Sequence, residues 1–283
     1  MRMMSFKRAN LVSALLVFCI GCEARETSLP TLRINGLDYP PEQVVQFKLP
    51  GLLREISGLA VDANDRLFAH GDEFGVIFLI DYEAGKITKR FQMGEKPVRD
   101  DFEGIAVSPE HIYLVTSNGT IYETSEGSDA AVVGYRKYPA QLDCEIEGLT
   151  YVDSNHELFA TCKTLKKGKR GIKVYRWSID EHRYASEPVV HLRRKQLLAT
   201  GFKDYQPSGI TLLAPGRILL VASKQKAFIV IDLEDSSVTA IDFSLPEIHS
   251  QAEGIAITSD GNLIIADEGK NKKGRLSVYH RNR

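Results

Sequence analysis

One short segment of mixed polar and apolar residues recurs five times along the chain. Its third residue is Ser or Glu, its fourth is Gly and its fifth is Leu or Ile. The five copies are Glu55–Leu59, Asp101–Ile105, Glu145–Leu149, Gln206–Ile210 and Gln251–Ile255, and their glycines lie 46, 44, 61 and 45 residues apart. A period in the forties is typical of propeller and solenoid repeats.

Each repeat contains further apolar runs. In the fifth repeat the turn Ser259–Asn262 separates two apolar runs, and Leu263–Ala266 forms the second of them. A third run alternates, as in Ile172–Trp177, and a fourth closes the first four repeats, as in Val238–Phe243. Four antiparallel strands per repeat make a propeller blade. The pattern therefore predicts an all-β fold, a five-bladed β-propeller with four antiparallel strands per blade.

The fifth repeat lacks its fourth run, because the chain ends shortly after Leu276–Tyr279. One unassigned strand, Val44–Leu49, precedes the first repeat. We expect this N-terminal strand to complete the last blade and to close the ring, which removes an open sheet edge. The third repeat is the longest, and its excess around Arg193–Leu198 predicts a short helix.

The N-terminus has the pattern of a targeting segment. Residues 1–10 carry three basic and no acidic residues, and the apolar run Leu11–Gly21 follows. This run is shorter than the ~20 residues that span a bilayer, so it indicates a signal peptide. A small residue directly before Cys22 resembles the lipobox of bacterial lipoproteins. The resemblance implies a lipoprotein signal peptide (1–21), lipidation of Cys22, a tether (22–40) and a propeller domain (41–283). The alternative is a plain signal peptide that is cleaved nearby.

Composition limits the possible functions. The chain has 283 residues, 36 Lys and Arg against 37 Asp and Glu, and 43% hydrophobic residues. These values exclude a disordered chain and a polyanion-coating protein, and no nucleic-acid partner is expected. Export would expose Cys144 and Cys162 to oxidising conditions, so they are candidate disulfide partners; buried free thiols are the alternative.

The third residue of each repeated segment falls at one height if the segment begins the innermost strand of a blade. These residues are Ser57, Glu103, Glu147, Ser208 and Glu253. Three carboxylates at one level would either take up protons or hold a cation. Carboxylate and hydroxyl oxygens suit Ca²⁺, so the sequence predicts a Ca²⁺ site in the central channel. Alternatively, the side chains only cap neighbouring strands or pair with Arg.

Further polar residues are expected at the same end of the channel. Glu55, Asp101 and Glu145 lie two positions before the predicted ring, either as a second ring or bonded to loop amides. The loops between second and third strands share this face and supply four candidate ligand-binding residues: Asp72, Lys163, Lys224 and Asp267. Basic loops at 166–170, 193–195 and 270–275 also gather there. They favour an anionic small molecule or a protein partner, or they keep the surface soluble or face the membrane.

Two resemblances support this interpretation. The repeats, the lipobox and the size resemble the SdiA-regulated, YjiK-like family of bacterial β-propeller lipoproteins, over residues 44–283. This implies export and lipid anchoring to a bacterial membrane, facing the periplasm. The order Ser57, Glu103, Glu147, Ser208, Glu253 is similar to the calcium-activated nucleotidases (apyrases), which implies a five-bladed propeller with Ca²⁺ in its tunnel.

Two functions are consistent with these patterns. The first is a membrane-tethered module with Ca²⁺ in its channel that binds a ligand or partner. The alternative is a Ca²⁺-dependent phosphoester hydrolase, with Glu55, Asp101 or Glu145 as general base and Lys163 and Lys224 on the phosphate. The chain has no G-x-S-x-G elbow and no Walker loop. No residue stands out as a nucleophile or a unique base, so we favour the binding module.

Overall fold

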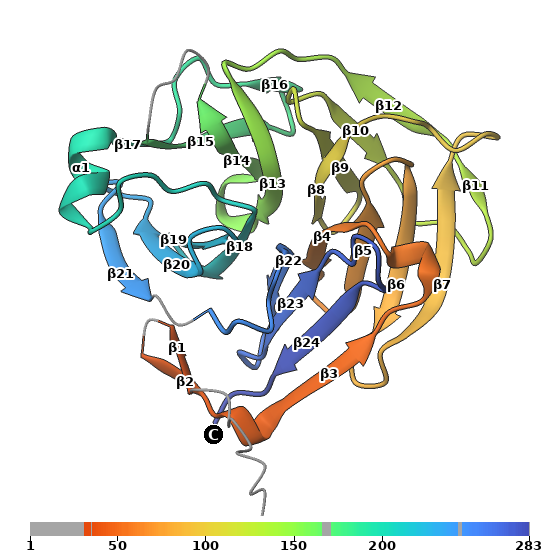
Figure 1. Ribbon diagram of the computed structural model, residues 1–283. Coiled ribbons are helices and arrows are strands. Elements are labelled where there is room, and N and C mark those ends of the chain that lie inside the picture. Colours follow the sequence, from red (N-terminus) through yellow and green to blue (C-terminus); the bar gives the residue numbers. More distant parts are fainter. Residues whose placement is uncertain (1–30, 35, 166–170, 243–244, 283) are drawn as a thin grey trace, which may run out of the picture.

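The computed structural model describes residues 31–34, 36–165, 171–242 and 245–282. Five sheets, antiparallel except for the parallel pair β7–β11, stand around a central axis as the blades of a propeller (Figure 1). The first blade contains β4 (Ile56–Val61), β5 (Leu67–Gly71), β6 (Val76–Asp81) and β7 (Lys86–Met93), with β11 (Val132–Val133) on its outer edge. The second contains β8 (Phe102–Val107), β9 (Ile112–Thr116), β10 (Ile121–Thr124) and β12 (Tyr135–Tyr138).

The other three blades repeat this order. The third contains β13 (Cys144–Val152), β14 (Glu157–Leu165) and β15 (Gly171–Ser178), with β16 (Arg183–Tyr184) and β17 (Val190–Arg193) both paired to β15. The fourth contains β18 (Gly209–Ala214), β19 (Arg217–Ala222), β20 (Ala227–Asp232) and β21 (Val238–Asp242). The fifth contains β22 (Ala252–Ile257), β23 (Leu263–Asp267), β24 (Arg275–Tyr279) and β3 (Val44–Lys48). Short 3-10 helices occur at Pro41–Gln43, Gly51–Leu53 and Asp153–Asn155.

The ring closes as the sequence predicts. Each innermost strand contacts the innermost strand of the next blade all the way round, from β4 through β8, β13, β18 and β22 back to β4. The N-terminal strand β3 pairs antiparallel with β24, so that both ends of the chain share the fifth blade. The short helix predicted in the third repeat is α1 (Arg194–Ala199). Fold class and closure are therefore confirmed.

Two short strands precede the first blade, within the segment that the sequence predicts as a tether. β1 (Leu32–Ile34) and β2 (Leu37–Tyr39) pair antiparallel as a hairpin. Leu32, Ile34 and Tyr39 are buried against the fourth and fifth blades, because their alternation places apolar side chains on one face of the hairpin. Residues 1–21, Cys22 and the first part of the tether lie outside the described residues. Within the described ranges, no helix is long and apolar enough to cross a membrane.

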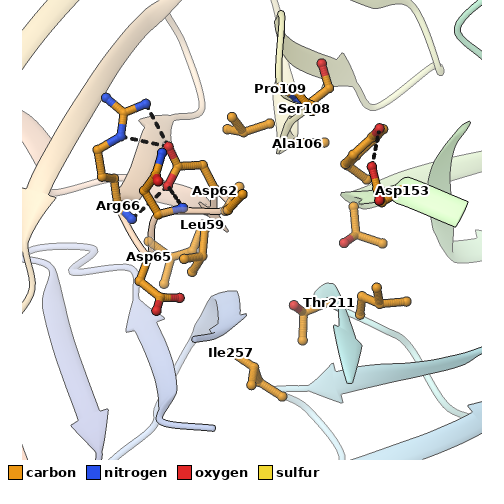
Figure 2. Close-up of a pocket in the computed structure, with 18 of the residues that line it drawn as sticks. Leu59, Asp62, Asp65, Arg66, Ala106, Ser108, Pro109, Asp153, Thr211 and Ile257 are labelled. Carbon is orange, nitrogen blue, oxygen red and sulfur yellow. Dashed lines mark hydrogen bonds and ion pairs between the residues drawn. The ribbon is translucent and has the colours of Figure 1, made fainter. Parts of the chain in front are cut away.

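The two ends of the channel are built from different parts of each blade. The innermost strands begin at one end, which we call the mouth. The turns that join the first and second strands gather at the other end, which we call the funnel (Figure 2). Because every blade has the same direction, residues at one position of the repeat meet at one end.

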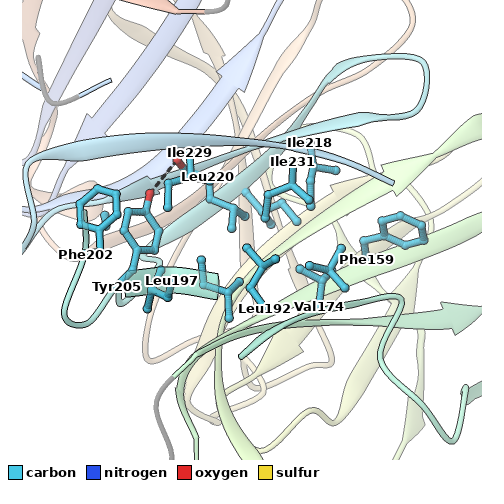
Figure 3. Close-up of a cluster of buried hydrophobic side chains, with 14 of the residues drawn as sticks. Phe159, Val174, Leu192, Leu197, Phe202, Tyr205, Ile218, Leu220, Ile229 and Ile231 are labelled. Carbon is cyan, nitrogen blue, oxygen red and sulfur yellow. Dashed lines mark hydrogen bonds between the residues drawn. The ribbon is translucent and has the colours of Figure 1, made fainter. Parts of the chain in front are cut away.

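Apolar clusters between adjacent blades hold the ring together. Figure 3 shows the cluster between the third and fourth blades, where Phe159 and Val174 face Ile218 and Ile231. Tyr205 is fully buried there, and its hydroxyl donates to the Leu220 carbonyl over 2.9 Å. Both faces of the inner strands are covered in this way, so strands such as β9 and β19 are almost continuously apolar.

The repeated glycines allow the innermost strands to approach one another. A Cβ atom at Gly104 would lie 2.6 Å from the Leu149 nitrogen of the next blade. At Gly209 it would lie 3.0 Å from the Glu253 carbonyl oxygen, and at Gly254 3.1 Å from the Leu59 nitrogen. These distances leave no room for a side chain, which explains why Gly recurs at this position.

The residue before the glycine sits at a local irregularity. The pairing register of the innermost strand shifts between Ile56 and Gly58, between Phe102 and Gly104, and between Ala252 and Gly254. The intervening residue has no partner on the second strand, as in a β-bulge. A bulge redirects its side chain away from the regular alternation. Ser57, Glu103 and Glu253 occupy these bulges.

Candidate functional site

Three glutamates and one lysine meet inside the channel mouth. Glu103 and Glu253 come from bulges in β8 and β22, and Glu147 lies at the corresponding irregularity of β13. Lys163 Nζ, from β14, donates to Glu147 Oε1 over 2.5 Å, and its charge also acts on Glu103 and Glu253. The structure therefore places Lys163 within the ring of carboxylates, and not only on the surrounding loops.

Burial and mutual repulsion hold protons on these carboxyl groups. Burial is the main cause that raises the pKa of Glu103 to about 9, and Glu147 adds to it. Burial raises the pKa of Glu253 to about 8 in the same way. The pKa of Glu147 rises to about 7, because its burial is partly opposed by Lys163. One ammonium group is too little to neutralise three buried carboxylates, so the mouth favours an additional proton or cation.

The two serines of the predicted ring differ from each other. Ser57 Oγ donates to Glu103 Oε2 over 3.3 Å and so belongs to the carboxylate cluster. Ser208 Oγ instead donates to the Ala252 carbonyl over 2.5 Å, which ties the fourth blade to the fifth. Among the described residues, no three His, Cys, Asp or Glu side chains form a preassembled metal site. Any cation bound here has to draw the glutamates together.

The polar residues above the ring bond mainly within their own blades. Glu145 Oε2 accepts from Thr164 Oγ1 over 2.6 Å, and Asp101 accepts from the Ser117 hydroxyl. Glu55 accepts from its neighbour Arg54 over 2.7 Å. In these contacts the three carboxylates bond to side chains and not to loop amides. Thr164 lies on β14, Ser117 directly follows β9, and Arg54 precedes β4.

Two predicted ligand-binding residues lie at the same entrance. Lys224 is exposed, and its Nζ donates to Gln206 Oε1 over 3.0 Å. Asp72 is half-buried, and burial together with Glu55 raises its pKa. Both residues line the entrance above the ring. The basic loop 166–170 lies outside the described residues, and Lys270, Lys272 and Lys273 are exposed.

Asp267 has a structural role that the sequence did not suggest. Its Oδ2 atom lies 2.7 Å from Nδ1 of His249, and Oδ1 accepts from the Gln251 amide over 3.2 Å. The other nitrogen of His249 contacts the Tyr279 hydroxyl at 2.5 Å, and all three side chains are buried. The role of Asp267 in ligand binding stays a prediction, and in the structure its carboxylate bonds to His249 and to the Gln251 amide within the fifth blade. His249 precedes the fifth repeated segment by only two residues. This position in the sequence is the signal that could have identified His249 as a partner of the fifth blade.

His70 lies beside the ring in the first blade. Its Nδ1 atom is 2.9 Å from the Gly71 carbonyl, and the side chain is fully buried. Its Nε2 atom has no described hydrogen-bond partner and occupies the space that a side chain at Gly58 would need. Burial lowers the pKa of His70 to about 4, so the imidazole is neutral at pH 7.

A disulfide links the ring strand to the strand that carries Lys163. Cys144 and Cys162 are bonded, with their Cα atoms 5.7 Å apart across β13 and β14. Both are adjacent in sequence to mouth residues, namely Glu145 and Lys163. The crosslink therefore restrains the pairing of Lys163 with Glu147.

An aliphatic waist closes the channel below the ring. The residue after each repeated glycine is Leu or Ile and is at most 4% exposed: Leu59, Ile105, Leu149, Ile210 and Ile255. The cavity that these residues surround measures about 10 Å³, which is room for about one water molecule. The mouth is thereby separated from the funnel.

Comparison with known proteins identifies the fold. No protein-family model matches the chain, and no curated protein matches it. The glutaminyl cyclase of Myxococcus xanthus is similar in structure, with a TM-score of 0.56 and 15% identity over 84% of this chain and 94% of that one.

Two further enzymes are similar to this chain. The PQQ-bound aldose sugar dehydrogenase of Streptomyces coelicolor has a TM-score of 0.51 and 13% identity, over 85% of this chain and 99% of that one. A luciferin-regenerating enzyme has a TM-score of 0.51 and 10% identity, over 83% and 94%. At these identities the similarity establishes a β-propeller fold that is shared with enzymes.

Proposed function

We propose that the protein is an exported, lipid-anchored β-propeller of the SdiA-regulated, YjiK-like kind, which binds Ca²⁺ at the channel mouth and acts as a ligand- or partner-binding module. The observation that carries this proposal is the buried cluster of three glutamates around one lysine. Glu103, Glu147 and Glu253 would hold the ion, together with Ser57. Bound Ca²⁺ would supply the positive charge that Lys163 alone does not provide.

The donor set fits a hard cation. Carboxylate and hydroxyl oxygens are the ligands that Ca²⁺ prefers, and waters complete its shell. Ca²⁺ and Lys163 compete for Glu147, because the ammonium group already occupies Oε1 at 2.5 Å. We expect Lys163 to act as an internal counter-ion that keeps the mouth folded until the metal binds.

A binding module is supported better than a phosphoester hydrolase. Each of the three candidate bases, Glu55, Asp101 and Glu145, already accepts a hydrogen bond or pairs with Arg54. None is distinguished by a neighbour that would activate it. Lys163 is paired with Glu147, so it is not free to hold a phosphate.

The decisive measurement is bound metal in the purified protein, combined with thermal unfolding in Ca²⁺ and in EDTA. We expect about one Ca²⁺ per chain. At a free concentration of 100 times Kd, Ca²⁺ stabilises the native state by about 2.7 kcal/mol. The pair Glu103→Gln and Glu147→Gln should abolish both effects, whereas Glu187→Gln, on an exposed glutamate of the third blade, should preserve them. Absence of metal and equal melting temperatures in Ca²⁺ and EDTA would overturn the metal site.

Lipid anchoring is tested separately. Cys22→Ala removes the only thiol to which the lipobox resemblance assigns an acyl chain. We expect the variant to move from the membrane fraction to the soluble fraction and to lose incorporation of labelled fatty acid. Unchanged membrane association would contradict the anchor and leave the metal site unaffected.

A further inference from the structure

The funnel is a second cavity, at the end of the channel opposite the mouth. Its volume is about 810 Å³, within the roughly 300–1,000 Å³ of small-molecule sites. Figure 2 shows Leu59, Ala106, Thr211 and Ile257 from four blades around one open space. The aliphatic waist separates this space from the glutamate cluster, so the funnel is a distinct site.

The wall of the funnel is apolar. The third residue after each repeated glycine is apolar or aromatic and half-buried: Val61, Val107, Tyr151, Leu212 and Ile257. In a globular protein such residues usually become fully buried. Here the residue at this position stays partly exposed in all five repeats, and its apolar side chain faces a cavity. Such a lining is typical of a site that binds an apolar group.

The rim of the funnel is acidic. Five carboxylates and one guanidinium group line it; the carboxylates are Asp62, Asp65, Glu110, Glu126 and Asp153. Arg66 pairs with Asp62 over 2.7 Å and with Glu126 over 2.9 Å, so its charge is already balanced (Figure 2 shows the pair with Asp62). A negative rim above low-dielectric walls raises the local concentration of cations.

An aromatic residue stands beside a carboxylate in this wall. The Tyr151 hydroxyl donates to Asp153 Oδ1 over 3.1 Å, and both side chains line the funnel. A tyrosine ring attracts organic cations through its electron-rich face, and the neighbouring carboxylate adds a charge interaction. An anion would meet repulsion from the rim, and a neutral molecule would use only the apolar wall.

We propose that the funnel binds an organic ammonium ion, that is, a protonated amine or a quaternary ammonium group on an apolar body. The apolar body contacts Leu212 and the other wall residues, and the cation lies between Tyr151 and Asp153. The proposal does not depend on Ca²⁺ at the mouth, because the two sites share no polar residue.

Three probes with the same aryl group and different charges test this assignment. Titration calorimetry with phenethylammonium, 2-phenylethanol and 3-phenylpropionate should rank them in that order of affinity, with at least a tenfold advantage for the ammonium ion over the alcohol. The order should persist in EDTA. Equal affinities for all three probes, or no binding of phenethylammonium at 10 mM, would overturn the proposal.

Matched variants locate the probe. Asp153→Asn should weaken phenethylammonium at least fivefold and leave the alcohol unchanged. Leu212→Arg places a positive charge in the wall and should abolish binding of the ammonium ion. Asp143→Asn, on an exposed aspartate away from the funnel, is the control and should bind like the wild type. Thermal unfolding verifies that each variant is folded. Full affinity in both Asp153→Asn and Leu212→Arg would place the probe elsewhere and refute the assignment.

Discussion

The mouth and the funnel are two ends of one channel, built by the same five strands. Both ends carry carboxylates, but they hold them differently. At the mouth, the side chains of Glu103, Glu147 and Glu253 are largely buried and share one lysine. At the funnel the carboxylates form a rim over an apolar wall, and Arg66 pairs with two of them. The mouth therefore suits a bare metal ion, whereas the funnel suits a cation with an apolar body.

The difference follows from where each residue stands relative to the repeated glycine. The residue before the glycine occupies a bulge, which turns a carboxylate into the channel. The residues after it follow the regular pleat and present aliphatic side chains. A single glycine per blade thus separates two chemical environments, and the aliphatic waist lies between them.

The largest loss of stability from a single substitution is expected at the waist. Gly104→Ala would place a Cβ atom 2.6 Å from a backbone nitrogen of the next blade. Such overpacking against backbone costs about 3 kcal/mol, and denaturant titration should show this loss of unfolding free energy. Gly51→Ala is the control, because no atom lies within 4 Å of its Cβ position. Equal stability of the two variants would mean that the glycines are not required for the close approach of the strands.

A smaller effect is expected from Lys163→Met, which removes the counter-ion of the mouth. Glu147 is 5% exposed, whereas Lys163 is 35% exposed, so the loss falls below the 3–5 kcal/mol of a fully buried pair, at about 2 kcal/mol in EDTA. Saturating Ca²⁺ should restore most of the unfolding free energy, because the metal replaces the ammonium charge. A deficit of the same size in Ca²⁺ and in EDTA would contradict the competition between the two cations. Lys173→Met, on β15, is a control of the same chemistry.

The third prediction concerns pH. The pKa values of Glu103, Glu147 and Glu253 are raised to about 9, 7 and 8 from the ordinary glutamate value of 4.5. The folded state therefore binds protons more tightly than the unfolded state. Its extra stability is complete below pH 4.5, declines as the pH rises above it, and is lost as the pH passes through 7 to 9. Each proton changes the unfolding free energy by about 1.4 kcal/mol per pH unit.

Denaturant titrations in EDTA between pH 6 and pH 9 check this linkage. The wild type should lose stability with rising pH, Glu103→Gln should show a smaller slope, and Ca²⁺ should flatten the wild-type curve. The difference between wild type and variant isolates the mouth from other titrating groups. A wild-type slope equal to that of Glu103→Gln would show that Glu103 does not carry the linked proton.

The features that repeat along the chain could be predicted. Five copies of one segment imply five blades, and the missing fourth strand of the last copy implies closure by Val44–Leu49. The number of blades and the closing strand both follow from counting the apolar runs, because each repeat contains the same strands in the same order. The convergence of Glu103, Glu147 and Glu253 was predictable for the same reason, because equivalent positions lie at one height.

The features that occur once could not be predicted in this way. Lys163 lies near the end of β14, and its long side chain reaches Glu147 on the neighbouring strand β13. From the sequence, Asp267 is expected in a loop at the mouth. Its contact with His249 is not visible there, because the two residues belong to different segments. The burial of Leu32 and Tyr39 depends on a surface that the fourth and fifth blades form together. The funnel was missed because half-buried aliphatic residues have the same sequence pattern as a core.

The smallest effect is expected at the rim of the funnel. Asp65 accepts from the Ser259 amide over 2.7 Å and from its hydroxyl over 2.5 Å, which joins the first blade to the fifth. Asp65 has a φ of 58°, which lies in the left-handed region. Asn tolerates this region, so Asp65→Asn removes the carboxylate charge without straining the backbone. We expect a loss of about 0.5 kcal/mol, because the bond is exposed to solvent. At pH 8 in EDTA, Glu103→Gln should instead increase the unfolding free energy. Glu103 has a pKa of about 9 in the folded state and must take up a proton on folding at this pH, whereas a glutamine is neutral without one. Opposite signs for the two carboxyl-to-amide changes would establish that the two ends of the channel hold their carboxylates for different reasons; equal signs would contradict it.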